Sequence, residues 1–170
     1  MHQSPFIHSV ADLLRGRAAS RQLALDIPVE WAIELSRVVP EPPLRADLEL
    51  THVSGGVLVR GSVDGVVGHV CHRCLDEWEQ EFTIEVAQLF QSEARADEDD
   101  DYVFAGDELD LEPMLRDEVL LAMPLAPTCS EECPGLVETS QTDLNGGSAD
   151  EGEEPASPFA VLQDLLGPGE

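Results

Sequence analysis

The sequence predicts an α+β fold in which an antiparallel β-meander packs against one helix. Three observations lead to this expectation. Apolar and polar residues alternate along residues 44–86, which is the pattern of half-buried strands. Residues 111–123 repeat apolar side chains at helical spacing. Two cysteine pairs follow the predicted strands and the predicted helix, where they can staple the two together, and an acidic flexible C-terminal region ending in a short helix completes the expected architecture.

The first 43 residues carry the weakest signals. Ser9 is positioned to cap a short helical turn over residues 10–14. Alternating apolar residues predict a strand that ends before Pro28 and a second strand over residues 31–39. A proline-containing loop then leads into the middle of the chain.

The middle of the chain is predicted to form successive antiparallel strands. Residues 44–50 alternate strictly, and Ser-Gly-Gly at residues 54–56 indicates a hairpin turn. Valines at even spacing continue over residues 57–67, and Asp64-Gly65 is either a second tight turn or part of one long strand with Gly65 as a bulge. Residues 78–86 give the clearest strand pattern. Because short turns join only antiparallel neighbours, three or four strands should form a meander.

The helix and the acidic region define the expected domain organisation. Asp110 can cap the helix, and Pro113 lies in the first turn, where its missing amide does no harm. Residues 1–136 are therefore expected to form one α+β domain. Residues 137–156 are rich in Gly, Ser, Asp and Glu and are predicted to be a disordered acidic linker. Residues 157–167 are predicted to form a short amphipathic helix.

Acidic residues dominate the charge balance. The 170 residues include 35 acidic and nine basic residues, all nine of them arginine, for a net charge of −26. Residues 1–92 carry a net charge of −6 and residues 93–170 one of −20. The absence of lysine excludes a P-loop lysine and a Schiff-base lysine, and so acidic a free-standing protein would repel nucleic-acid phosphates. The acidic half is expected to be solvated or to meet a basic partner.

Neither an export signal nor a membrane span is visible in the sequence. The first residues lack a positive region followed by an apolar core, and no apolar run approaches the roughly 18 residues that cross a bilayer. A cytoplasmic protein is therefore expected. In that compartment four cysteines are metal ligands or free thiols rather than disulfides.

The cysteines form the strongest chemical motif. Cys71 and Cys74 form a C-x-x-C pair between two predicted strands, and Cys129 and Cys133 follow the helix with three residues between them. Four thiolates arranged as a tetrahedron at about 2.3 Å from a metal suit structural zinc. Such a site would tie the hairpin to the end of the helix.

Two other interpretations of the cysteines remain open. They can be reduced thiols without a ligand, two of them facing the core. Alternatively, Cys71 and Cys74 can form a redox pair, although such a pair needs a helix N-terminus to lower the pKa of the attacking thiol, and a strand pattern follows Cys74. His69 and His72 flank the first pair and could replace a cysteine as metal ligands. We expect instead that both histidines are exposed polar residues at the end of a strand.

Other chemical motifs are weak or absent. An acidic run matches four positions of a calcium-loop template, but the glycine position holds Tyr102, so we interpret the run as a solvated loop. The matching residues are Asp97, Asp99, Asp101 and Glu108. The sequence contains no G-x-S-x-G, H-E-x-x-H or G-x-G-x-x-G motif. It therefore predicts a protein that is not an enzyme.

Three segments occur in an order that points to a family. They are Cys71–Leu75 after the hairpin, the block Asp110–Leu136 with its Leu-Leu-Ala-Met-Pro-Leu-Ala-Pro core, and the closing Ser157–Leu162. Together they resemble the bacterial YceD family, the large ribosomal RNA subunit accumulation proteins. The resemblance implies a non-enzymatic role in producing or stabilising large-subunit ribosomal RNA. Many members carry a further C-x-x-C after the Gly-Leu pair, whereas residues 137–142 contain no cysteine.

These observations together predict an acidic ribosome-biogenesis factor that works by contact. Its expected partner is a basic ribosomal protein or a pre-ribosomal particle, held by charge complementarity until RNA takes it over. No membrane or small-molecule substrate is expected. The alternatives are a zinc-free thiol-redox protein using Cys71 and Cys74, a metal-dependent hydrolase using the Asp97–Asp101 cluster, and direct contact of ribosomal RNA through arginines. These arginines are Arg15, Arg17, Arg21, Arg37, Arg45, Arg60 and Arg73.

Overall fold

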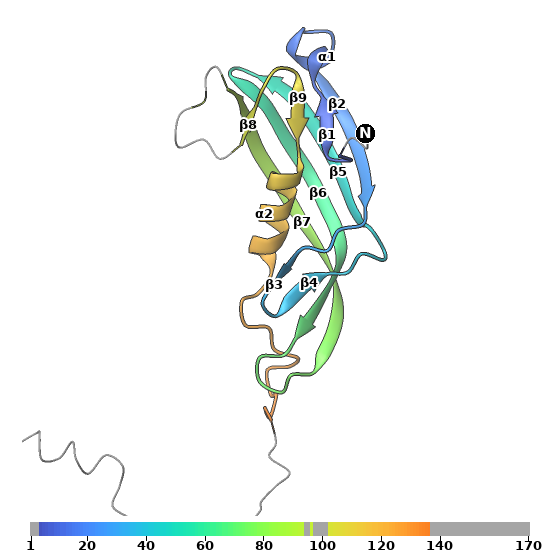
Figure 1. Cartoon of the computed structure of the whole chain (residues 1–170), viewed down its shortest axis with the longest axis vertical. Helices are drawn as coiled ribbons and strands as arrows, with labels where there is room; N and C mark the ends of the chain where they lie inside the picture. The colour runs from blue at the N-terminus through green and yellow to red at the C-terminus, as the bar shows by residue number, and fades with distance from the viewer. Residues whose placement is uncertain (1–3, 94–95, 97–101, 137–170) are drawn as a thin grey trace, which may run out of the picture. The chain divides into compact units, whose positions relative to one another are not determined.

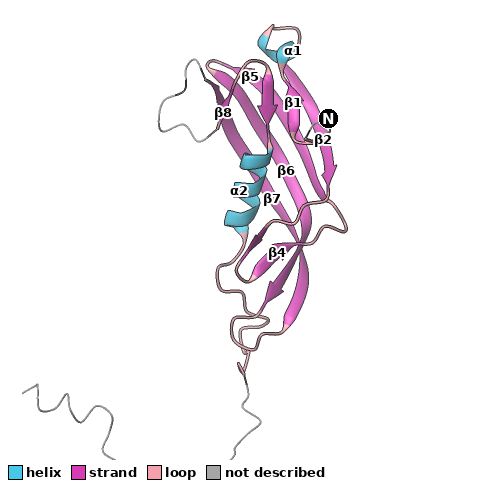
Figure 2. Ribbon diagram, viewed as in Figure 1, coloured by secondary structure: helices cyan, strands magenta, loops and turns pink. Residues whose placement is uncertain are grey.

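A mainly antiparallel sheet packs against helix α2 in the computed structural model, which describes residues 4–93, 96 and 102–136 (Figures 1 and 2). The elements in chain order are β1 (Ile7–Ser9), α1 (Ala11–Leu14), β2 (Ser20–Ile27), β3 (Ala32–Ile33), β4 (Ser36–Val38), β5 (Leu44–Val53), β6 (Gly56–Val70), β7 (Glu77–Ser92), β8 (Val103–Phe104), β9 (Glu108–Asp110) and α2 (Glu112–Ala122). The predicted α+β class is confirmed.

Strand β6 is the centre of the main sheet, which has seven strands in the described ranges. It pairs antiparallel with β7 along one side and with β5 and then β4 along the other. β2 extends the sheet beyond β5, and β3 extends it beyond β4. The consecutive strands β5, β6 and β7 are the predicted meander. β8 adds a short parallel pairing to the end of β7, and β1 pairs with β9 in a separate two-stranded sheet.

Gly65 lies within one long strand. The register between β6 and β7 runs without interruption from Gly56 opposite Gln91 to Val70 opposite Glu77, so both the tight turn and the bulge considered at Gly65 are wrong. A Cβ atom on Gly65 would lie 2.9 Å from the Phe82 ring and 3.0 Å from a Leu44 methyl carbon. Gly65 therefore leaves room for neighbouring side chains that cross over the strand.

The predicted strand over residues 31–39 is wrong. This segment folds back on itself as the hairpin of β3 and β4, with Ile33 opposite Ser36 and Glu34-Leu35 at the turn. The turn contains no Gly, Asn or Asp, which are the residues that usually identify such turns in a sequence. The alternation of apolar residues therefore continued through the turn and concealed it.

Helix α2 covers one face of the sheet, as Figure 1 shows beside β6 and β7. The N-cap is Leu111, one residue after the predicted Asp110, and it makes no side-chain cap hydrogen bond. Asp110 still accepts a hydrogen bond from the Glu112 amide at 3.0 Å at the helix start. Met114, Leu115 and Val119 are buried. Among the described residues the core cluster contains 24 buried apolar side chains, most of them from α2, the strands and the N-terminal elements.

Among the residues that the structure describes, none lies in a helix long and apolar enough to cross a membrane. The predicted linker over residues 137–156 and the predicted helix over residues 157–167 lie outside the described residues.

Candidate metal centre

The first cysteine pair lies in the turn that joins β6 to β7. The Cys71 amide donates to the Asp76 carbonyl at 2.8 Å, and the Leu75 amide donates to the Cys71 carbonyl at 3.0 Å. Leu75 has a φ of +63°, in the left-handed region that bulky residues rarely adopt. The Arg73 amide points at the Cys71 sulfur, with the nitrogen 3.4 Å from Sγ. The turn thus directs backbone N–H groups at its own sulfur, as a thiolate ligand requires.

The second cysteine pair follows α2, which ends just before Pro124. The His72 amide donates to the Pro127 carbonyl at 3.0 Å, so the two segments are joined by backbone as well as by side chains. The Cys133 amide donates to the Ser130 carbonyl at 3.2 Å, which closes a turn between the two cysteines. We call residues 71–76 and 124–136 together the cysteine end.

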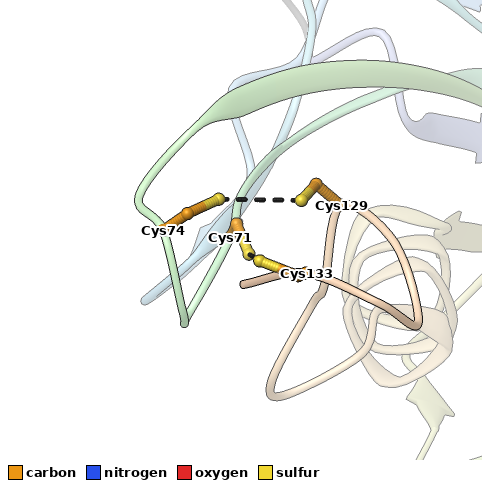
Figure 3. A group of neighbouring side chains, drawn as sticks. All are labelled: Cys71, Cys74, Cys129 and Cys133. Atoms are coloured by element: carbon orange, nitrogen blue, oxygen red, sulfur yellow. Dashed lines mark hydrogen bonds between the residues drawn. The ribbon is translucent and has the colours of Figure 1, made fainter. Parts of the chain in front are cut away.

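The four sulfur atoms converge on one point, all within 4.8 Å of one another. Figure 3 shows the side chains of Cys71 and Cys74 from one segment facing those of Cys129 and Cys133 from the other. The Cys71 and Cys133 sulfurs are 3.7 Å apart, and those of Cys74 and Cys129 are 3.6 Å apart. A tetrahedron with metal–sulfur bonds of about 2.3 Å has edges of about 3.8 Å. Both distances match such an edge, so the cluster has the size of a four-thiolate metal site.

Burial and charge differ among the four thiols. Cys71 and Cys133 are buried, Cys74 is partly buried and Cys129 is exposed. Burial alone raises the pKa of the Cys71 thiol, but backbone amides, including those of Cys74 and Arg73, outweigh it and lower the pKa to about 5. The Asp76 backbone lowers the pKa of Cys74, but burial and the neighbouring thiols outweigh it, so that pKa is raised. The Cys133 thiol is the main cause that raises the pKa of Cys129. One negative sulfur is therefore favoured without a cation, whereas four together need positive charge at their centre.

The redox interpretation lacks its structural context. Cys71 and Cys74 lie between two strands, and β7 begins at Glu77. A helix N-terminus, which would activate an attacking thiol, does not follow the pair.

His69 corrects one expectation from the sequence. It was expected to be exposed, but it is buried, its Nδ1 lies 2.7 Å from the Ser36 hydroxyl oxygen, and its ring contacts Trp78 at a centroid distance of 5.2 Å. His72 is exposed as expected, with Nδ1 3.0 Å from the Pro127 carbonyl oxygen. The hairpin of β3 and β4 brings Ser36 to His69, and no signal in the sequence revealed that hairpin.

Only one of the four calcium-loop candidates lies within the described residues. Glu108 lies in β9, while Asp97, Asp99 and Asp101 lie outside the described residues. Four of the seven arginines considered for RNA contact form ion pairs with neighbouring acids. These pairs are Arg15–Asp107, Arg21–Asp12, Arg45–Asp26 and Arg60–Glu49.

Comparison with known proteins identifies the family. The model of the family described as "Large ribosomal RNA subunit accumulation protein YceD" matches residues 59–166, a span that begins in β6 and includes all four cysteines. The chain belongs to the YceD family. The match confirms the resemblance carried by the cysteine-containing segments, and the family's name points to a role in ribosomal RNA accumulation.

Mycobacterial proteins are similar along nearly the whole chain. A protein of Mycobacterium tuberculosis is 28% identical over 172 residues, covering 97% of this chain and 83% of its own length. A protein of Mycobacterium leprae is 31% identical over 179 residues, covering 97% of this chain and 79% of its own. Both are described as uncharacterized proteins. No solved structure matches the chain.

Proposed function

We propose that this YceD-family protein is a non-enzymatic factor that supports accumulation of large-subunit ribosomal RNA by binding a basic ribosomal protein or a pre-ribosomal particle. The observation that carries the proposal is a row of carboxylates on β7, which we call the glutamate row. It consists of Glu77, Glu79, Glu81 and Glu85.

The glutamate row has the properties of a surface for a cationic partner. Its four residues are exposed and occupy alternate positions, so their side chains project from the same face of the sheet about 7 Å apart, with Thr83 in the remaining position. None of the four makes an ion pair with a described residue. Like charges on one strand face repel one another, and a basic partner would relieve that repulsion.

The arginines favour a protein partner over direct RNA contact. Four of the seven are paired to carboxylates, which offsets part of the positive charge that phosphate groups would need. A basic partner held on the glutamate row would instead be transferred to ribosomal RNA, which carries more negative charge along its backbone.

Affinity purification at two salt concentrations tests this function. We expect the full chain to recover basic ribosomal proteins or pre-ribosomal particles from lysate at low salt and less of them at moderate salt, because exposed charge pairs are screened. Replacing the four residues of the glutamate row by glutamine should reduce recovery, with the thiol cluster intact as a control. Recovery of neither particles nor basic ribosomal proteins at either salt would refute the proposal.

We also propose that the four cysteines bind one structural zinc ion. The two measured sulfur–sulfur distances, the convergence of all four sulfurs and the N–H group directed at Cys71 support a tetrahedral thiolate site. A closed set of four protein ligands leaves no position for substrate, so the ion would hold structure only. Native mass spectrometry should find one zinc per chain, and Cys74→Ser should lose it. Full zinc occupancy in Cys74→Ser would contradict this ligand set.

A further inference from the structure

Within the part of the chain that the structure describes, one edge of strand β7 is open along most of its length. β6 pairs with residues 77–91 on one side, whereas β8 pairs with only Gln91 and Ser92 on the other. The Gln91 amide donates to the Tyr102 carbonyl on the β8 side, at 2.9 Å. Backbone groups alternate in direction along a strand, so the N–H and C=O groups of the other odd-numbered residues of β7 also point toward the open edge. From residue 79 to residue 87, these groups make no backbone hydrogen bond to any part of the chain that the structure describes.

The same odd-numbered residues carry the glutamate row. At Glu79, Glu81 and Glu85 the backbone groups point toward the open edge, and the carboxylate of the same residue projects from one face of the sheet. If the edges of two copies paired, glutamates would lie beside glutamates, which is destabilising. A strand with lysine or arginine at alternate positions would meet opposite charges instead. The edge thus disfavours a second copy and favours a cationic strand.

The opposite face of β7 offers apolar contacts. Phe82 and Ile84 are only partly buried, although they pack against the core. A groove of about 310 Å³ lies over β6 and β7 beside the end of α2, and its lining includes Val67, Phe82, Ile84, Val119 and Met123. Alternate side chains of a strand added beside β7 would project on the groove side of the sheet.

We propose that the open edge of β7 over residues 79–85 binds an extended segment of a basic protein as an added strand. Cationic side chains of that segment would face the glutamate row, and the alternating apolar side chains would face the groove, while the backbone supplies hydrogen bonds. The inference rests on the proposed function for its basic partner and adds the surface and the bound conformation.

A synthetic peptide tests the pattern that this edge should recognise. The labelled probe alternates lysine and valine over eight residues, and the control peptide has four lysines followed by four valines. In fluorescence anisotropy at low salt, the full chain should bind the alternating peptide about fivefold tighter or more, because only this order matches charge and apolar groups together. Hydrogen exchange should slow at the Glu81, Thr83 and Glu85 amides on binding. Equal affinity for the two peptides would overturn the proposal.

Substitutions at Thr83 test the backbone contact. Thr83→Pro removes an outward N–H and leaves the hydrogen bonds to β6 in place, so it should weaken binding about tenfold. Thr83→Val is the matched control, because both variants lose the bond from the Thr83 hydroxyl to Asp64, at 2.6 Å. Circular dichroism should verify that both variants fold. Equal binding by the two folded variants would overturn the added-strand mode.

Charge variants test the proposal without changing the backbone. Glu79→Gln with Glu81→Gln should weaken binding about fivefold at low salt, whereas Glu30→Gln with Glu41→Gln, an equal charge change at exposed positions elsewhere, should change it less than about twofold. Equal losses in the two double variants would overturn the proposal, as would sedimentation evidence that β7 edges pair two copies.

The peptide and lysate experiments separate the two proposals. If lysate recovery succeeds and is the same for Thr83→Pro and Thr83→Val, the added-strand inference fails and the proposed function stands. If lysate recovery fails while the alternating peptide binds as described, the proposed function fails and the edge remains a site for a cationic strand.

Discussion

The sheet-and-helix body and the cysteine end achieve order by different means. The body buries all 24 residues of the apolar core cluster. The cysteine end contributes none of them, and its leucines at positions 75, 125 and 136 are 56%, 87% and 67% exposed. Backbone hydrogen bonds and converging sulfurs join its two segments instead. The comparison teaches that backbone hydrogen bonds and a convergent set of ligand atoms can join segments that are too short and too exposed to form an apolar core.

Removing the proposed zinc ion should produce the largest contrast between the two regions. In Cys74→Ser, or after chelation, amide hydrogen exchange at Leu75 and Cys133 should accelerate by about a thousandfold or more, because structural zinc binding supplies folding energy where apolar burial is absent. Amides at the centre of β5 and β6 should keep their protection. Ser130→Ala serves as a control that leaves all four sulfurs in place. Uniform loss of protection across the sheet would show that the regions are not separate.

A cavity in the body should produce the reverse contrast. Leu48 is completely buried, so Leu48→Ala should lower the free energy of unfolding by about 3–4 kcal/mol in urea denaturation. Leu89→Ala, at a residue that is 41% exposed, should lower it by less than about 1 kcal/mol. Both variants should bind one zinc per chain. Loss of zinc from a folded Leu48→Ala protein would contradict independence of the two regions.

The junction between the regions should show a smaller effect. Ser36→Ala leaves the Nδ1 atom of buried His69 without its hydroxyl partner, two residues before Cys71, and should cost about 1–2 kcal/mol of unfolding free energy. Thermal unfolding measures the loss, with Ser62→Ala at a less buried position as the comparison. An equal change in the two variants would remove the special role of the Ser36–His69 contact.

The sequence predicted the long elements because their patterns are regular. Strict alternation predicted β5 and the first part of β7, and helical spacing predicted α2 to within one residue at each end. The hairpin of β3 and β4 was missed because its turn lacks the usual residues, and His69 was misplaced as a consequence. β8 and β9 contain too few residues to show any period.

The sequence predicted which four cysteines form the cluster. It did not predict which sulfur atoms contact one another across the two segments. Spacing grouped the cysteines by segment, as Cys71 with Cys74 and Cys129 with Cys133. The structure also brings sulfurs together across the segments, at 3.7 Å for Cys71 and Cys133 and 3.6 Å for Cys74 and Cys129, because the β6–β7 turn faces the segment after α2. The open edge of β7 likewise depends on which strands lie beside it, and local patterns do not contain that information.

Acid should produce the smallest effect, and it should arise in the body. Burial, with a smaller contribution from the positive charge of Arg21, lowers the pKa of His8 below 6.5 in the folded protein. The unfolded chain therefore takes up this proton first, so the contribution of His8 to stability is complete above pH 6.5 and decreases as the pH falls towards its folded pKa. The loss should be less than about 1 kcal/mol, because His8 is only partly buried and solvent screens Arg21.

Urea denaturation between pH 7.5 and 5 measures this effect. The free energy of unfolding should decline less steeply with falling pH in His8→Phe than in the unmodified protein. His52→Gln, at an exposed position, controls for the loss of a histidine. If the free energy of unfolding of His8→Phe falls as steeply with pH as that of the unmodified protein, the buried Nε2 does not resist protonation. This Nε2 has no hydrogen-bond partner among the described residues.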